Sequence, residues 1–475
     1  MKDDLGLKIG LEVHCQLTVL KTKLFCSCPS NYRGEDPNTN ICEVCTGMPG
    51  TLPVLNEKAV EAAVKIALAL DCKISESMNF FRKNYFYPDL PKNFQITQYD
   101  KAGGSPIAKE GLVETIAGII RIRRIQLEED PGKLSYEGTI VSSPISLVDY
   151  NRAGVALVEI VTEPDLKSPK HAREFLQKLR SILEHIGVCD GSLEGAMRCD
   201  ANVSLFGGKR VEVKNISSFK EVERALNFEI TRQKTMANVA KAEGMETRHW
   251  DDVRRVTVTL RVKEAEEDYR YFPEPDLVPI TISKEYVADI RKRMPELPDE
   301  RKARFVKQYV ISEEIAGVLV GEKLLADIFE ESLKVYMAPK LLGSWLAIDI
   351  LGYLNRSEKT LADMKFKPKD LAELAKKVEK KKLTENTAKS VIIKAIEQGK
   401  STFEFAKEGA AITDEKSIMD AVKEVFEANP KAVEDAKSDP KAINFLMGQL
   451  MKATKGRADH ELARKTIEEA IAAGS

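Results

Sequence analysis

The stretch "KIGLEVHCQL", residues 8 to 17, alternates apolar and polar side chains in a short run. This period of two predicts a β-strand in which Glu12 and His14 share one face while Leu11 and Val13 lie on the other. A carboxylate and an imidazole on one face could bind a metal ion or a phosphate. The alternative is an ordinary edge strand with its polar side chains in solvent, which is the more frequent case for such a stretch.

The composition is that of a soluble globular protein with a substantial core. A chain of 475 residues should divide into two or three domains. Its 73 lysines and arginines balance 74 aspartates and glutamates, so a nucleic acid would have to bind through local patches. No apolar stretch approaches the roughly 20 residues of a membrane span, and the N-terminus lacks the apolar segment of a signal peptide. We expect a cytoplasmic protein without a membrane partner.

The first 294 residues mix signals for strands and helices, which indicates an α+β fold. A helix over 168–187 is predicted by Ser168 as its N-cap and Gly187 at its end, with proline at the first helical position. Another helix is predicted over 56–72. Alternating apolar residues predict strands at 118–130, 210–217 and 253–264.

The character of the sequence changes near "MPELPDERKARF", residues 294 to 305. Prolines punctuate this stretch, and the chain beyond it is almost wholly helical in period. A second break lies near residues 397 to 410. We therefore predict a large α+β domain over 1–294, a helical connector over 295–408 and a small helical tail over 409–475.

The cysteines are unevenly distributed, since four of the eight lie within twenty residues of one another. Cys26 and Cys28 form one close pair, Cys42 and Cys45 form another, and the loop between them is rich in turn-forming residues. Two such pairs can wrap one tetrahedral zinc ion, and clustering of this kind in an intracellular chain favours metal binding over disulfides. Because the protein would supply all four ligands, the sequence predicts a closed structural Zn²⁺ knuckle over 26–45.

Acidic and amide side chains recur at predicted strand ends. Together with Glu12 and His14 they could form an oxygen-rich Mg²⁺ site of the kind that holds nucleotide phosphates. The alternative is that each carboxylate is simply solvated. The residues concerned are Glu128, Glu129, Asp130, Asp200, Asn202, Glu212, Lys214 and Asn215.

Aromatic and basic residues crowd into "FRKNYFYPDLPKNFQITQYD", residues 81 to 100. The segment could be a nucleic-acid surface or the wall of an active site. The alternative is a packed irregular loop anchored by Tyr85, Phe86 and Tyr87. A similar mixture recurs over residues 266 to 279. The chain contains no phosphate-binding P-loop, no dinucleotide fingerprint and no G-x-S-x-G elbow.

Long segments of the sequence resemble the B subunits of tRNA-dependent glutamyl/aspartyl amidotransferases, and the resemblance runs from the first strand to the tail. The matching segments include "IGLEVHCQL", "RKNYFYPDLPKNFQITQYD", "EEDPGK", "DYNRAG", "VEIVTEPD", "RCDANVS", "EVKNISSF", "DYRYFPEPDLVP", "PELPDERK" and "FLMGQLMKATKGRAD". The cysteine knuckle resembles that of the zinc-containing members of this family.

The resemblance implies a function within a heterotrimer. An amidase-type A subunit would hydrolyse glutamine to ammonia, and a small C subunit would wrap around the other two. This chain would use Mg-ATP to phosphorylate the side-chain carboxylate of misacylated Glu-tRNA(Gln) or Asp-tRNA(Asn), and ammonia would then displace the phosphate. The family's ATP site lies in an antiparallel-sheet cradle similar to the glutamine synthetase fold, which explains the missing P-loop, and the family's tail module binds tRNA.

The same resemblance implies roles for individual residues. Lys83 matches a position on the ammonia route, while Asn202, Lys214 and Asn215 would contact the nucleotide. The positions that match the family's metal-site and catalytic residues are Glu12, His14, Glu128, Glu129, Asp200 and Glu212.

Two alternatives remain open. One is the paralogous subunit that serves only Glu-tRNA(Gln). That paralogue carries a large inserted domain, whereas in this chain residues 266–283 lead directly to residues 295–302, which argues against it. The other is a non-catalytic tRNA-binding scaffold in which the acidic residues are merely structural. The choice between Glu-tRNA and Asp-tRNA as the physiological substrate does not follow from the sequence.

Overall fold

The chain forms two compact units in the computed structural model, Met1–Leu297 and Pro298–Ser475. The residues described are 6–137, 143–205, 208–236, 245–262, 266–357, 359–402, 405, 415–436, 440–454, 456 and 458–473. The first unit holds one hydrophobic cluster, and the second holds two, within 305–396 and 418–471. The predicted division into three domains stays a prediction, because its second boundary lies outside the described residues.

The strands that the structure describes belong to the first unit. They are β1 (Lys8–Gln16), β2 (Lys73–Ile74), β3 (Ser77–Met78), β4 (Phe81–Asn84), β5 (Phe94–Thr97), β6 (Ala108–Thr115), β7 (Gly118–Glu129), β8 (Lys133–Tyr136), β9 (Ser146–Asp149), β10 (Ala156–Thr162), β11 (Met197–Ser204), β12 (Arg210–Ile216), β13 (Met245–Asp251), β14 (Val256–Val262), β15 (Phe272–Pro273) and β16 (Ile280–Thr281). The three predicted strands are confirmed as β7, β12 and β14.

The helices of the first unit are α1 (Glu57–Ala69), α2 (Pro169–His185), α3 (Phe219–Met236), the short 3-10 helix η1 (Glu266–Tyr269) and α4 (Lys284–Lys292). The second unit contains α5 (Pro298–Tyr309), α6 (Glu313–Gly321), α7 (Lys323–Val335), α8 (Pro339–Ser344), the π-helix η2 (Trp345–Ile350), α9 (Leu351–Ser357), the 3-10 helix η3 (Leu361–Asp363), α10 (Pro368–Glu379), α11 (Glu385–Gln398), α13 (Glu415–Ala428), α14 (Pro430–Asp435), α15 (Pro440–Ala453) and α16 (His460–Ala473). Within the described part of the chain, no helix is long and apolar enough to cross a membrane.

A twelve-stranded sheet organises the first unit, and β1 lies near its centre. The order along the sheet is β14-β13-β12-β11-β1-β10-β7-β5-β4-β15, with β6 also paired to β7 and β2 to β6. Because β1 is hydrogen-bonded to both β10 and β11, the edge-strand alternative is wrong. The sheet is mixed rather than wholly antiparallel: β12 and β13 are parallel, and α3 makes the crossover between them.

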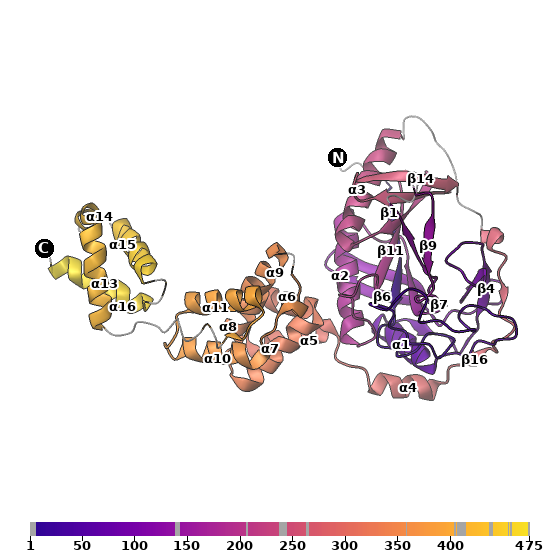
Figure 1. The fold of residues 1–475 in the computed structure, drawn as a ribbon, viewed down its shortest axis with the longest axis horizontal. Helices are drawn as coiled ribbons and strands as arrows, with labels where there is room; N and C mark the ends of the chain where they lie inside the picture. The colour runs from indigo at the N-terminus through magenta and orange to yellow at the C-terminus, as the bar shows by residue number, and fades with distance from the viewer. Residues whose placement is uncertain are drawn as a thin grey trace. The chain divides into compact units, whose positions relative to one another are not determined.

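One face of this sheet is covered by helices (Figure 1). Helix α3 packs against β11, β12 and β14, and α1 packs against β6 and β7. The apolar side chains of β1, from Ile9 to Cys15, are buried in this layer together with Phe175 of α2 and Leu226 of α3. The polar side chains of β1 therefore lie on the opposite face, as the alternation predicts. An α+β fold with a helical C-terminal region is confirmed.

The predicted ends of α2 are confirmed in detail. The Ser168 side chain accepts a hydrogen bond from the backbone N–H of His171, Pro169 is the first helical residue, and Gly187 has φ of 69° just beyond the last turn. Helix α1 is shorter than predicted, because Asn56 is its N-cap and the helix ends at Ala69.

Candidate active site

The candidate active site begins on the polar face of β1, from which Glu12 and His14 project. Glu12 lies beside Asp200 of β11 in the register of the sheet. His14 lies between Glu159 of β10 and Arg198 of β11. Residues far apart in the sequence are therefore neighbours here because three strands are paired in a fixed register.

His14 is the positively charged centre of this face. Its Nε2 lies 3.3 Å from a carboxylate oxygen of Glu128 and 3.8 Å from one of Glu159. Burial alone would lower the pKa of His14, but the hydrogen bond and charge of Glu128, aided by other carboxylates, raise it to about 9. Burial acts in the opposite sense on Glu128, whose pKa is nevertheless lowered to about 2 by His14 and Lys83. Both side chains are therefore ionised at neutral pH.

A second ionic cluster lies beside the first, centred on Lys214 of β12. Its Nζ is 2.6 Å from an oxygen of Asp200 and 3.3 Å from one of Glu212. Burial would raise the pKa of Asp200, but the charge of Lys214 lowers it. The Asn202 amide donates to a Glu12 carboxylate oxygen at 3.0 Å. Five of the residues singled out in the sequence thus lie on this face, three of them around Lys214 and two in the pair of Asn202 and Glu12.

A pocket of about 260 Å³ joins the two clusters. Residues of β4, β5 and β7 complete its wall, while Glu12, Asn202 and Glu212 lie on the same face beyond it. The lining residues are His14, Lys83, Tyr85, Gln95, Glu128, Pro131, Leu157, Arg198, Cys199, Asp200, Lys214 and Ile216.

Glu129 does not join this face, although it follows Glu128 directly. Successive residues of a strand point to opposite faces. The Glu129 carboxylate is instead 2.6 Å from Nζ of Lys92 and lines a separate pocket of about 290 Å³ beside the ion pair of Arg82 and Glu274. The structure therefore does not bring Glu129 to the carboxylates that it was predicted to join.

Lys83 lies in an aromatic corner of the first pocket. Its Nζ is 5.0 Å from the centre of the Tyr269 ring and 5.6 Å from that of Tyr85. Burial alone would lower the pKa of Lys83, but Tyr271, Tyr85 and the Glu128 carboxylate hold it above its ordinary value. The two aromatic segments of the sequence therefore meet, because β15 pairs with β4.

The alternative of a packed loop anchored by three aromatic residues does not hold for two of them. Phe86 is 73% exposed and Tyr87 is 47% exposed, whereas Tyr85 lines the pocket. Only the first of the three rings therefore lines the pocket.

Two further charged residues of this face, Glu159 and Arg198, were not singled out from the sequence. Glu159 is the one polar residue within the otherwise apolar "ALVEIV" of β10, and that interruption was the available signal. Asn215, predicted to contact the nucleotide, belongs to β12, but its side chain lies outside the described residues.

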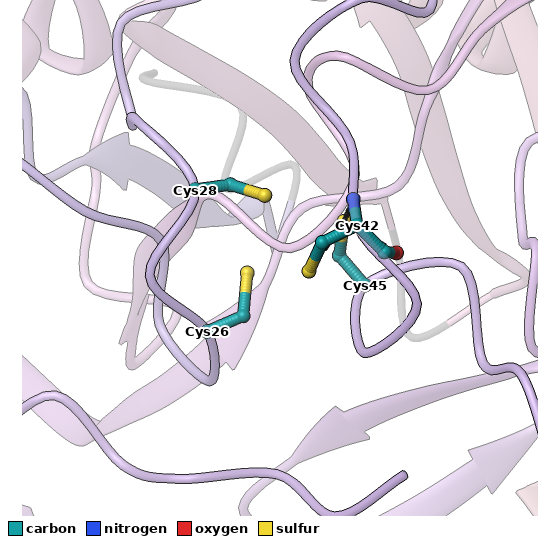
Figure 2. Close-up of side chains that lie close together, drawn as sticks. All are labelled: Cys26, Cys28, Cys42 and Cys45. Carbon is teal, nitrogen blue, oxygen red and sulfur yellow. Dashed lines mark hydrogen bonds between the residues drawn. The ribbon is translucent and has the colours of Figure 1, made fainter.

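The four predicted cysteine ligands converge on a common point. Figure 2 shows Cys26 and Cys28 on one loop facing Cys42 and Cys45 on another. Their sulfur atoms all lie within 4.8 Å of one another, and within the described chain no other group of histidine, cysteine or acidic side chains meets this criterion. This donor set fits zinc.

The thiols of the knuckle are held in a polar setting. The hydrogen bond from Cys26 lowers the pKa of Cys45 to about 4. The backbone N–H of Cys42 and the charge of Lys23 act in the same direction, whereas burial acts in the opposite direction. The Cys42 N–H lies 3.2 Å from Cys45 Sγ. These contacts therefore favour the thiolate form of Cys45.

Comparisons with known proteins agree with this arrangement. The family description "GatB/GatE catalytic domain" matches residues 7–288, and the description "GatB domain" matches 327–471. Both units of the chain therefore contain a matched region.

The chain is also similar, over nearly its whole length, to proteins named as the B subunit of aspartyl/glutamyl-tRNA(Asn/Gln) amidotransferase. It is 51% identical to the protein of Sulfurisphaera tokodaii over 469 residues, which cover 98% of this chain and 99% of that protein. It is 47% identical to the Thermotoga maritima protein and 46% identical to the Methanococcoides burtonii protein, each over 98% of both chains. The chain therefore belongs to the family of amidotransferase B subunits, which are ligase-type enzymes.

Proposed function

We propose that this chain activates the side-chain carboxylate of misacylated Glu-tRNA(Gln), Asp-tRNA(Asn) or both by phosphorylation with ATP. Ammonia from a glutaminase partner would then amidate the activated residue. One observation carries the proposal: carboxylates and cations from five strands meet on one face of the sheet, around the pocket that His14, Glu128 and Asp200 line.

The reaction needs charge neutralisation more than covalent help from the protein. An oxygen of the substrate carboxylate attacks the γ-phosphorus of ATP, the bond from phosphorus to the β–γ bridging oxygen breaks, and ADP leaves with that electron pair. Ammonia then attacks the acyl carbon. The carbon–oxygen bond breaks, and phosphate leaves with a proton from the attacking nitrogen.

The residues of the polar face suit this chemistry. Mg²⁺, when bound, would neutralise phosphate charge and align the reacting oxygens. We propose that Mg²⁺ is held by Glu12, Glu128, Asp200 and Glu212, with Asn202, Lys214 and Asn215 toward the nucleotide. His14 would either lose its proton to become a further ligand or stay protonated and orient Glu128. Glu129 faces the second pocket. It would therefore take part in the reaction only if a substrate or ammonia passes through that pocket.

Lys83 is the proposed residue of the ammonia route. Its ammonium group lies among tyrosine rings at the edge of the pocket, where it can orient an incoming nitrogen nucleophile. The chain has no amidase nucleophile motif, which agrees with ammonia being made by a separate, amidase-type A subunit. We propose a cytoplasmic heterotrimer of this chain, that partner and a small C subunit.

The remaining parts of the proposal concern binding. The cysteine knuckle would hold one structural Zn²⁺, and the helical tail would contact tRNA. We also propose that the sheet is a cradle of the glutamine synthetase type, because one face carries helices while the other presents charged side chains.

The scaffold alternative makes a different prediction about the polar face. If the acidic residues were only structural, Glu212→Ala would leave ATP-dependent phosphorylation of Glu-tRNA(Gln) intact. The Glu-tRNA(Gln)-only paralogue is tested by supplying both misacylated tRNAs and measuring each amidated product.

The experiment uses the reconstituted complex with ATP, glutamine and each tRNA. We expect Asp200→Ala and Glu212→Ala to abolish amidation while glutamine hydrolysis by the partner persists. Asp165→Ala is the matched control, since Asp165 pairs with Arg121 away from the pocket. A parallel loss of glutaminase and amidation would mean that the carboxylates serve assembly.

A further inference from the structure

We propose that Arg198 binds the oxygens of the transferred phosphoryl group and that Asp130 positions it for this task. The inference rests on the proposed function and deepens it. Arg198 lines the pocket and lies beside His14 in the register of β1 and β11.

Asp130 is the anchor of Arg198. One Asp130 oxygen accepts a hydrogen bond from Arg198 Nη2 at 2.7 Å, and the other accepts one from Gln16 Nε2 at 2.8 Å. Arg152 lies 3.6 Å from the same carboxylate, whose side chain is fully buried. Asp130 is therefore fully engaged and does not line the pocket, so its role is to fix the guanidinium.

Two other cations of the pocket differ from Arg198 in their partners, while a third, Lys83, lies among tyrosine rings. His14 is paired with Glu128, and Lys214 with Asp200, and these carboxylates themselves line the pocket. They are the groups proposed to hold Mg²⁺. The Asp130 carboxylate that pairs with Arg198 does not line the pocket. The side of the guanidinium that faces the pocket is therefore left for a ligand.

Arg198 also has an unused donor. Its Nε–H is buried and has no hydrogen-bond partner in the part of the chain that the structure describes. A buried donor without an acceptor is unfavourable, so a small movement of the side chain that brings this N–H to a ligand oxygen in the pocket would be favoured. A guanidinium fork matches the geometry of phosphate oxygens, which a lysine ammonium does not.

Gln16 extends the support toward the cysteine knuckle. Its Oε1 accepts a hydrogen bond from Arg33 Nη2 at 2.7 Å, and its Nε2 also lies 3.1 Å from the Tyr32 hydroxyl. Both residues belong to the loop between the two cysteine pairs. The knuckle loop thus holds Gln16, and Gln16 holds Asp130 from the side opposite Arg198.

The test compares Arg198→Lys with Arg121→Lys in the reconstituted complex. Arg121 forms an arginine–aspartate pair of the same kind with Asp165 on the surface, so it controls for loss of a guanidinium. Calorimetry measures binding of ATP and ADP, and release of labelled phosphate measures turnover with Glu-tRNA(Gln). We expect Arg198→Lys to weaken ATP binding at least roughly tenfold, to leave ADP binding within about threefold and to lower kcat roughly 100-fold.

Asp130→Asn separates positioning from binding. We expect a lower kcat with little change in the KM for tRNA, and we expect Arg121→Lys to match the wild type in every measurement. Equal ATP binding and turnover in Arg198→Lys and wild type would overturn the inference, as would equal losses in Arg198→Lys and Arg121→Lys. A wild-type complex that binds ATP but shows no tRNA-dependent turnover would contradict the proposed function, while a selective ATP defect in Arg198→Lys would still support the phosphate contact.

Discussion

Glu128 and Glu129 illustrate what a single position can determine. They are adjacent acidic residues, yet one carboxylate lies 3.3 Å from His14 and the other 2.6 Å from Lys92 on the opposite face. The sequence identifies both as polar residues at a strand end. The pleat of β7 and its pairing with β10 assign them to separate pockets.

Lys23 lies next to the cysteine knuckle and contacts one of its sulfur atoms. It is fully buried, and its Nζ lies 2.8 Å from the carbonyl oxygen of Asn40 and 3.6 Å from Cys45 Sγ. No carboxylate pairs with it in the described structure. A buried cation needs an anion, and four thiolates around a zinc ion would carry excess negative charge, so Lys23 and a metal bound at the cysteines would stabilise each other.

We predict that Lys23→Met weakens zinc binding by roughly tenfold to 100-fold, the usual effect of removing a group that supports metal ligands. Competition with a coloured chelator measures the affinity. Wild-type protein should hold about one equivalent, and Cys42→Ser/Cys45→Ser should hold none. The exposed Lys21→Met is the control and should match the wild type. Unchanged affinity in Lys23→Met would remove the charge-balancing role.

At the scale of elements, α1 is joined to α4 by an ionic cluster. Glu61 of α1 contacts Lys58 and Lys65 of its own helix, and Arg293 at the end of α4 lies 3.2 Å from it. The hydrogen bond from Lys58 lowers the pKa of Glu61 to about 2. Lys65 also lowers it, whereas burial acts in the opposite direction.

A carboxylate whose pKa is lower in the folded state than in the unfolded state stabilises the protein at pH values above the unfolded-state pKa. This stabilisation is lost as the pH falls toward the folded-state pKa. We predict that Glu61→Gln lowers the free energy of unfolding by about 1 kcal/mol at pH 7, since the cluster is partly solvated. The difference from wild type should shrink below about pH 4.5. Urea unfolding at pH 7 and pH 4 measures it, with the exposed Glu57→Gln as control. A difference that does not change with pH would contradict the ionic explanation.

The contact between β6 and the end of α1 depends on a glycine. A Cβ on Gly111 would lie 2.2 Å from Cys72 Sγ and 2.6 Å from the Leu70 carbonyl oxygen. We predict that Gly111→Ala lowers the free energy of unfolding by roughly 1–3 kcal/mol, because backbone must move to admit the methyl group. Chemical denaturation checks it. Gly321→Ala, with no atom near its Cβ position, should be neutral or stabilising, and equal effects of the two substitutions would refute the steric explanation.

At the scale of the whole molecule, the knuckle belongs to the first unit alone. Since the second unit has its own hydrophobic clusters, the units should unfold in separate transitions. We predict that chelating the metal lowers the melting temperature of one calorimetric transition by several degrees and leaves the other unchanged. The Cys42→Ser/Cys45→Ser variant should show no response to chelator. A single transition that moves as a whole would contradict this prediction.

Local patterns in the sequence were sufficient for several secondary elements and for the grouping of the four cysteines. Alternation predicts β1, β7, β12 and β14, the cap residues predict α2, and cysteine spacing predicts the ligands in Figure 2. These features depend on residues close together in the chain, whose backbone geometry is set by neighbouring side chains.

Tertiary structure alone decided which polar residues meet. Strand order places β1 between β10 and β11, and the register brings His14 to Glu159 and Arg198. The pleat of β7 directs Glu129 to another pocket, and the pairing of β15 with β4 brings the Tyr269 ring of a distant segment to 5.0 Å from Lys83 Nζ. The period of two along a strand indicates only that a side chain lies on one of the two faces of the sheet. Only long-range pairing, selected by burying the apolar faces together beneath the helices, determines which partners it finds there.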